Sequence, residues 1–225
     1  TSVADGTATI TATSGSLSGT ASVTVIVPAS LELSDTVLTF SALGDTTQLT
    51  ATVKDAAGSV ISNPTVTWAT SDESVATVSS AGLVTSVADG TVTITANSGE
   101  VSDTGAVTVA QVASTVELSA TTVSLTSIGD TATLTATVKD AAGSEVAGST
   151  VTWATSNSSV ATVSSTGLVT AVANGTATLT VTSDSLEATA AVTVAQAAAS
   201  IELSDTVLTF SALGDGVRLV ATVRD

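Results

Sequence analysis

The chain has 225 residues, which is enough for one large domain or two to three small ones, and it contains no His and no Cys. Without an imidazole or a thiolate it lacks the commonest general base, the strongest nucleophile and the usual zinc and copper ligands, so we expect no enzyme. Four Lys and Arg residues against 20 Asp and Glu residues give a net charge of −16. Such a chain repels polyanions, so nucleic acid is excluded as an expected partner.

The first segment, residues 1–27, looks like the end of a repeating unit. Its Val3–Thr7 recurs as Val87–Thr91 and, with changes, as Val172–Thr176. We expect two strands here, over 7–12 and 21–27. The N-terminus resembles no signal peptide, and no apolar run in the chain has the length of a membrane-spanning helix. We therefore expect no membrane insertion in this segment, with any export signal or anchor outside it.

The central feature is an internal repeat with a period of 85 residues, which separates Trp68 from Trp153. Residues 31–109 align with 116–194 without a gap, and 48 of the 79 positions are identical. Two stretches this similar must share one fold. We predict four parts: a C-terminal repeat fragment at 1–27, complete repeats at 28–112 and 113–197, and an N-terminal repeat fragment at 198–225.

Within each repeat the apolar residues alternate with polar ones, as in strands with one buried face. Strands are predicted over 48–53, 65–68, 91–96 and 107–109, separated by turn residues at 55–58, 81–82 and 89–90. In the last fragment we expect strands over 200–210 and 217–223. About seven short strands per repeat predict an all-β fold of immunoglobulin-like antiparallel β-sandwiches, arranged end to end in tandem.

Several of these segments together resemble the bacterial immunoglobulin-like domain of the group-2 type, found in invasin- and intimin-like adhesins, other giant surface proteins and some phage virion proteins. The resemblance lies in residues 44–53, 66–68, 74–79, 82–85 and 90–96, whose order recurs in both complete repeats. It covers nearly the whole chain. It implies the sandwich fold and an extracellular setting, whereas function varies within the family.

Trp68 and Trp153 are the two largest side chains of the chain, and an exposed Trp often anchors a protein interface. Here each Trp is in phase with an inward-facing Val, Val66 or Val151, in its strand. We therefore predict that Trp68 and Trp153 fill the cores of their sandwiches.

Four carboxylates at the predicted domain ends are candidates for calcium, which often stiffens junctions between extracellular sandwiches. They are Asp45, Asp55, Asp130 and Asp140. The alternative is that each Asp caps its own turn, because the dense Asp-x-Asp spacing of a dedicated calcium loop is missing. We predict turns, with calcium as the one possible cofactor.

The linkers around residues 27–30, 110–114 and 195–200 are short and poor in Gly, which is typical of a stalk rather than of loosely tethered domains. We predict structural spacer repeats of a large secreted or cell-surface prokaryotic protein, such as an adhesin. The alternatives are a subunit of a polymeric extracellular fibre or surface layer, and a virion domain that binds host glycans weakly. Expected partners are neighbouring repeats of the same chain, other copies of the chain in a fibre or layer, and a host surface or glycan contacted elsewhere in the protein.

Overall fold

The computed structural model describes residues 5–224, in which every regular element is a β-strand. The contacts divide the chain into two units. Unit 1 comprises Thr1–Val112 with Asp140–Ser144, and unit 2 comprises Ala113–Lys139 with Glu145–Asp225. The described residues include no helix of the length and apolarity that crossing a membrane requires. The all-β class predicted from the sequence is confirmed.

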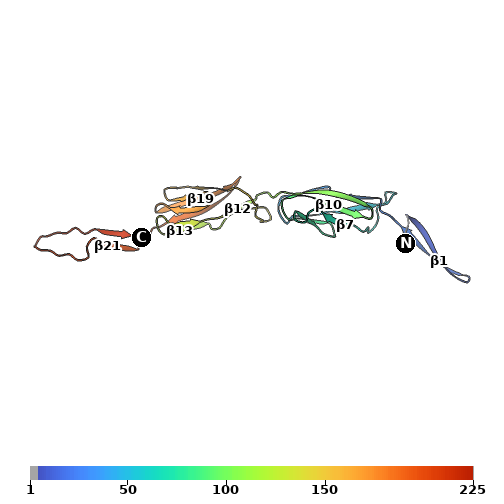
Figure 1. Ribbon diagram of the computed structural model, residues 1–225, viewed down its shortest axis with the longest axis horizontal. Helices are drawn as coiled ribbons and strands as arrows, with labels where there is room; N and C mark the ends of the chain where they lie inside the picture. Colours follow the sequence, from blue (N-terminus) through green and yellow to red (C-terminus); the bar gives the residue numbers. More distant parts are fainter. Residues whose placement is uncertain (1–4, 225) are drawn as a thin grey trace. The chain divides into compact units, whose positions relative to one another are not determined.

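The sandwich of unit 1 is built from nine strands in three hydrogen-bonded groups (Figure 1). Four strands form one sheet in the order β4-β11-β10-β7, and the opposite side consists of the pair β3-β6 and the group β5-β9-β8. Their bounds are β3 Ser30–Leu33, β4 Val37–Phe40, β5 Thr46–Gln48, β6 Ala51–Lys54, β7 Thr67–Thr70, β8 Ala76–Val78, β9 Leu83–Ser86, β10 Gly90–Ser98 and β11 Val101–Val109.

The long hairpin of β10 and β11 organises the four-stranded sheet of unit 1. Its register pairs Gly90 with Val109 and Ser98 with Val101, and β4 joins β11 in parallel. In β10 the side chains of Val92, Ile94 and Ala96 are buried, while the Thr residues between them face outward. This alternation of buried and exposed residues places one side of the hairpin in the core.

The core of unit 1 consists of two neighbouring hydrophobic clusters. The larger one joins residues of both sides of the sandwich, with Ile94 and Val107 from one side and Leu49 and Val84 from the other. The smaller cluster gathers around Leu31, Val53 and Ala96. Aliphatic side chains from both sides therefore hold the unit together, as in other sandwiches.

Unit 2 repeats this architecture. Its four-stranded sheet has the order β13-β20-β19-β16, and the pair β12-β15 and the group β14-β18-β17 complete the fold. The bounds are β12 Thr115–Leu118, β13 Thr122–Leu125, β14 Thr131–Thr133, β15 Ala136–Lys139, β16 Thr152–Thr155, β17 Ala161–Val163, β18 Leu168–Ala171, β19 Gly175–Ser183 and β20 Leu186–Val194. Its two core clusters contain residues of unit 2 only.

Each complete repeat has nine strands rather than the seven that the sequence suggested. The predicted strand 48–53 is in fact two strands, because β5 pairs with β9 while β6 pairs with β3. The chain changes partners at Leu49, whose amide donates to the Gly82 carbonyl, and at Thr50, whose carbonyl accepts from the Ser34 amide. The strand that carries the first Trp also begins later than predicted, at Thr67.

At the two ends of the chain the strands form separate two-stranded pairs. Residues Gly6–Ser14 (β1) pair with Leu17–Val25 (β2), and Ser200–Leu203 (β21) pair with Ala221–Arg224 (β22). Strands β21 and β22 are shorter than predicted, since residues 204–220 contain no strand. The apolar side chains of these pairs, such as Ile10 and Ile201, are largely exposed.

Candidate functional site

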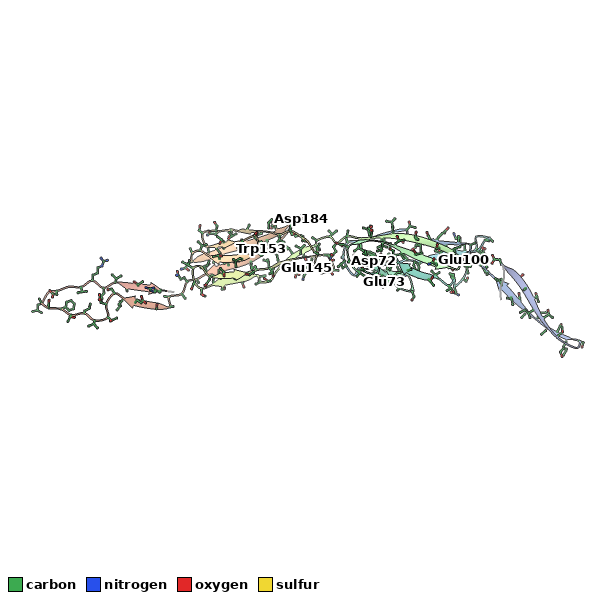
Figure 2. All side chains as sticks on the ribbon, in the orientation of Figure 1. Asp72, Glu73, Glu100, Glu145, Trp153 and Asp184 are labelled. Carbon is green, nitrogen blue, oxygen red and sulfur yellow. The ribbon has the colours of Figure 1, made fainter. Side chains whose placement is uncertain are left out.

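Trp68 connects the two core clusters of unit 1. It lies on β7, the edge strand of the four-stranded sheet, and its half-buried side chain packs against both clusters. Trp153 on β16 connects the two clusters of unit 2 in the same way, within the sandwich (Figure 2). Both Trp residues pack in cores in the structure, and each has one part of its surface in contact with solvent.

A glycine on the opposite side of each sandwich makes room for the indole. Gly82 has a φ of 84°, and a Cβ built on it would lie 2.8 Å from Cζ2 of Trp68 and 2.5 Å from the Leu49 carbonyl oxygen. Gly167 occupies the equivalent position in unit 2, where the same added atom would lie 3.1 Å from Cζ2 of Trp153. Both the left-handed backbone and the close contact therefore require Gly at this turn.

The carboxylates of Asp55 and Asp140 cap equivalent hairpin turns. Asp55 Oδ1 accepts hydrogen bonds from the amides of Ala57 and Ser59, both at 2.9 Å. Asp140 Oδ1 accepts from the amides of Ala142 at 3.0 Å and Ser144 at 2.9 Å. In each turn one carboxylate oxygen thus satisfies two backbone donors, which is how Asp stabilises tight turns.

Asp140 differs from Asp55 in the contacts of its second oxygen. Asp140 is 2% exposed, and its Oδ2 accepts from the Gln111 side-chain amide and from the Leu43 backbone amide, both at 2.9 Å. The hydrogen bond from Gln111, followed by that from Leu43, lowers the pKa of the Asp140 carboxyl below its usual value, although burial opposes this shift. Asp140 is therefore a buried carboxylate that accepts hydrogen bonds from Leu43, Gln111, Ala142 and Ser144.

Asp130 caps the loop that leads into β14. Its Oδ2 accepts hydrogen bonds from the amides of Thr126 at 3.0 Å and Ser127 at 2.8 Å. Asp215 in the last segment has the same role toward Ser211 and Ala212, and the Ala212 amide, followed by Ser211, lowers the pKa of its carboxyl. Asp45 takes part through its backbone carbonyl, which accepts from the Ser86 amide at 3.0 Å.

The four calcium candidates do not assemble into a cluster. Among residues 5–224 no group of three or more Asp or Glu side chains is placed to hold a metal ion. Asp55, Asp130 and Asp140 direct carboxylate oxygens at backbone N–H groups instead. These residues suit a turn better than a metal site, and a calcium contribution stays a prediction for experiment.

Sequence reasoning missed one recurring polar contact near the end of each repeat. Asp89 Oδ1 accepts a hydrogen bond from the backbone amide of Gln111 at 2.8 Å, and Asn174 Oδ1 accepts one from the backbone amide of Gln196 at 2.7 Å. The 85-residue spacing of Gln111 and Gln196 was the available signal. It pointed to a structural role, but no local pattern identified the acceptors.

A hollow of about 360 Å³ opens in unit 1, and the residues lining it carry no titratable side chain. They are Ile26, Pro28, Ile61, Asn63, Pro64, Thr65, Ser98 and Gly99. The hollow therefore contains the hydroxyl groups of Thr65 and Ser98 but no side chain that could act as their general acid or base.

The profile of one domain family matches the chain twice, over residues 29–109 and 112–194, and its description is bacterial Ig-like domain (group 2). The chain belongs to this family. Its two group-2 domains include both sandwiches described above, and together they span well over half of the 225 residues.

A comparison with curated proteins finds no match to these tandem group-2 domains. Among solved structures they are similar to domains 1–6 of the surface layer protein SbsC, with 24% identity, a TM-score of 0.41, and coverage of 84% of this chain and 32% of the other. Domains 4 and 5 of the S-layer protein SbsC give 26% identity, a TM-score of 0.39, and 75% and 99% coverage. The Escherichia coli adhesin FdeC gives 21% identity, a TM-score of 0.39, and 78% and 68% coverage. The chain thus spans about a third of the length of the first of these structures.

Proposed function

We propose that the two group-2 domains are structural spacers in a larger protein displayed on a prokaryotic cell surface or secreted from the cell. The observation that carries this proposal is that each complete repeat closes around its own core. The clusters around Ile94 in unit 1 and Leu179 in unit 2 contain only residues of their own unit. A domain that has its own hydrophobic core can stay folded and act as a spacer without a bound ligand.

The chemistry of the chain supports a mechanical role rather than a catalytic one. His and Cys are absent from the sequence, and three of the four carboxylates singled out in the sequence, those of Asp55, Asp130 and Asp140, accept hydrogen bonds from backbone amides in turns. The absence of Cys suits a stable fold that needs no disulfide, which is common on bacterial surfaces. The net charge of −16 keeps such Val-rich sheets soluble.

Single-molecule force spectroscopy on the full chain tests the spacer role. We expect two discrete unfolding events, each releasing roughly 250 Å of chain, because about 80 extended residues at 3.3–3.6 Å each replace a folded sandwich. Smooth extension at low force without steps would contradict a load-bearing role. Antibodies against the repeats should label intact cells, and labelling only after lysis would contradict the surface location.

A further inference from the structure

Two loops of unit 2 contain the triplet Asn-x-Ser/Thr, which is the acceptor sequence of N-linked glycosylation where x is not Pro. The triplets are Asn157-Ser158-Ser159, in the loop between β16 and β17, and Asn174-Gly175-Thr176, which leads from the loop after β18 into β19. Ser and Thr are abundant in this chain, so the triplet alone is weak evidence. The geometry of the two loops decides whether they suit an acceptor.

The side chains of Asn157 and Asn174 use their oxygen in the fold and leave their nitrogen unpaired. Asn157 Oδ1 accepts a hydrogen bond from the backbone amide of Ser159 at 3.1 Å, and Asn174 Oδ1 accepts one from the backbone amide of Gln196 at 2.7 Å. Both side chains are exposed, and within residues 5–224 neither Nδ2 atom has a hydrogen-bond partner. A sugar attached to Nδ2 would therefore leave both contacts of the oxygen intact.

Unit 1 has carboxylates at the two equivalent positions. Asp72 Oδ1 accepts a hydrogen bond from the backbone amide of Ser74 at 2.9 Å, and Asp89 Oδ1 accepts one from the backbone amide of Gln111 at 2.8 Å. The fold thus requires an acceptor oxygen at each position, which Asp and Asn both supply. The amide nitrogen, by which Asn differs from Asp, makes no contact, so the local fold does not account for the choice of Asn in unit 2.

The two loops lie side by side at one end of the sandwich of unit 2. The carbonyl oxygen of Val160 in the first loop accepts hydrogen bonds from the amides of Val172 at 2.8 Å and Ala173 at 3.2 Å in the second. The hydroxyl groups at the third position of the triplets, those of Ser159 and Thr176, are exposed and have no partner in the part of the chain that the structure describes. Each triplet therefore presents both of its reacting groups to solvent.

We propose that Asn157 and Asn174 are acceptors for N-linked glycosylation of this chain. The donor is an oligosaccharide joined through a diphosphate to a lipid, and a transferase of the exporting cell supplies the catalysis. The amide nitrogen bonds to the anomeric carbon of the first sugar, the bond from that carbon to the phosphate oxygen breaks, and the lipid diphosphate leaves with the electron pair. One amide proton passes to a base of the transferase. This modification goes beyond the spacer role, which requires no glycan.

The glycans replace charge as the hydrophilic cover of this end of the sandwich. Three carboxylates of unit 1, Asp72, Glu73 and Asp89, have neutral counterparts in the two loops of unit 2. Figure 2 marks Asp72 and Glu73 in unit 1. Carboxylates keep a surface hydrated and soluble, and a glycan does the same without charge.

The two acceptors differ in how accessible they are in the folded chain. All three residues of the Asn157 triplet lie outside strands, whereas Thr176 belongs to β19 and pairs with Thr193 of β20. A transferase has to bind the acceptor triplet in its own active site, which is easier for a loop than for a paired strand. Asn157 is therefore expected to be the more fully occupied of the two sites.

Mass spectrometry of the full chain purified from the cells that produce it tests the proposal. We expect up to two oligosaccharides, on Asn157 and Asn174. The variants Ser159→Ala and Thr176→Ala keep both Asn side chains and the backbone amides that they contact, but remove the hydroxyl group that the acceptor sequence requires. Each should lower the occupancy of its own site at least about tenfold and leave the other site unchanged.

Two further variants provide matched controls. Asn97→Gln changes an Asn that has Gly99 at the third position, so the glycan content should stay the same. Asp89→Asn gives unit 1 the triplet of Asn174 at the equivalent position and should add a third oligosaccharide. Thermal unfolding of each variant establishes that it remains folded. The proposal is overturned if the native chain has the mass of the polypeptide alone, if the sugars are attached to Ser or Thr hydroxyl groups, or if Ser159→Ala and Thr176→Ala retain their glycans.

Discussion

Gly82 lies so close to Trp68 that an added Cβ would come within 2.8 Å of the indole Cζ2 atom. The glycine belongs to the turn before β9 and the Trp to β7, so a contact between opposite sides of the sandwich fixes both residues. The Gly82 carbonyl also accepts the Leu49 amide, which links the turn to the residue where the chain passes from β5 to β6. The left-handed backbone of Gly82 and the packing of the Trp68 indole in the core therefore depend on each other.

Gly82→Ala is expected to destabilise unit 1 more than Gly58→Ala does. Both glycines have positive φ, 84° and 79°, so both substitutions bear the left-handed backbone cost of about 1–2 kcal/mol. Only Gly82 has neighbours within 4 Å of the added Cβ, and overpacking adds about 1–3 kcal/mol. Denaturant unfolding of the two variants measures the difference. If both variants lost the same free energy of unfolding, the structure around Trp68 would accommodate the added methyl group without an energetic penalty.

Trp68→Ala is expected to lower the free energy of unfolding of unit 1 by about 3–5 kcal/mol, because it leaves a cavity between two core clusters. Unit 2 should keep its unfolding midpoint, since its core clusters contain none of the residues of unit 1. Trp153 is then the one remaining Trp, so its fluorescence reports unit 2 while circular dichroism follows both units. A shift of the Trp153 transition by several degrees would contradict independent cores.

Chelation of calcium is expected to leave the melting temperature unchanged. The carboxylates of Asp55, Asp130 and Asp140 already accept backbone hydrogen bonds, so a cation would compete with N–H donors in the native turns. Thermal unfolding with millimolar EDTA and with millimolar calcium measures this. A large drop on chelation, abolished by Asp130→Asn and Asp140→Asn, would instead establish a calcium site.

Asp140 is expected to make unit 1 sensitive to acid. The hydrogen bonds from Gln111 and Leu43 lower the pKa of the folded carboxyl below its usual value of 3.8, which the unfolded chain retains. Its contribution to stability is therefore fully present above that value and is lost as the pH falls through the lower folded pKa. Gln111→Leu removes the strongest of these donors and should flatten the dependence of stability on pH in the acid range.

The matched comparison for acid sensitivity is Asp55→Asn against Asp140→Asn. Both variants change the same residue type at equivalent turns, but only Asp140 has a hydrogen bond from the Gln111 side chain. Urea unfolding between neutral pH and about pH 3 should show a flatter dependence of stability on pH for Asp140→Asn than for Asp55→Asn. If stability depended on pH identically in the two variants, Asp140 would not be responsible for the loss of stability in acid.

The repeat and its alternation of apolar and polar residues were sufficient to predict tandem sandwiches. A period of 85 residues requires a repeated fold, and a period of two places Val92, Ile94 and Ala96 on one side of a strand whatever its neighbours are. The inward direction of Trp68 followed from its phase with Val66 in the same way. The Asp55 turn was also predictable, since an Asp caps donors within four residues of itself.

Contacts between distant segments depend on the tertiary structure. The division of 48–53 into β5 and β6 comes from two different pairing partners, β9 and β3, which no local pattern of residues specifies. The difference between Asp55 and Asp140 has the same origin. Their turns have nearly the same sequence, yet the second oxygen of Asp140 meets Leu43, 97 residues away along the chain. A periodic sequence determines which side of a strand is buried, whereas only the folded chain determines what lies against it.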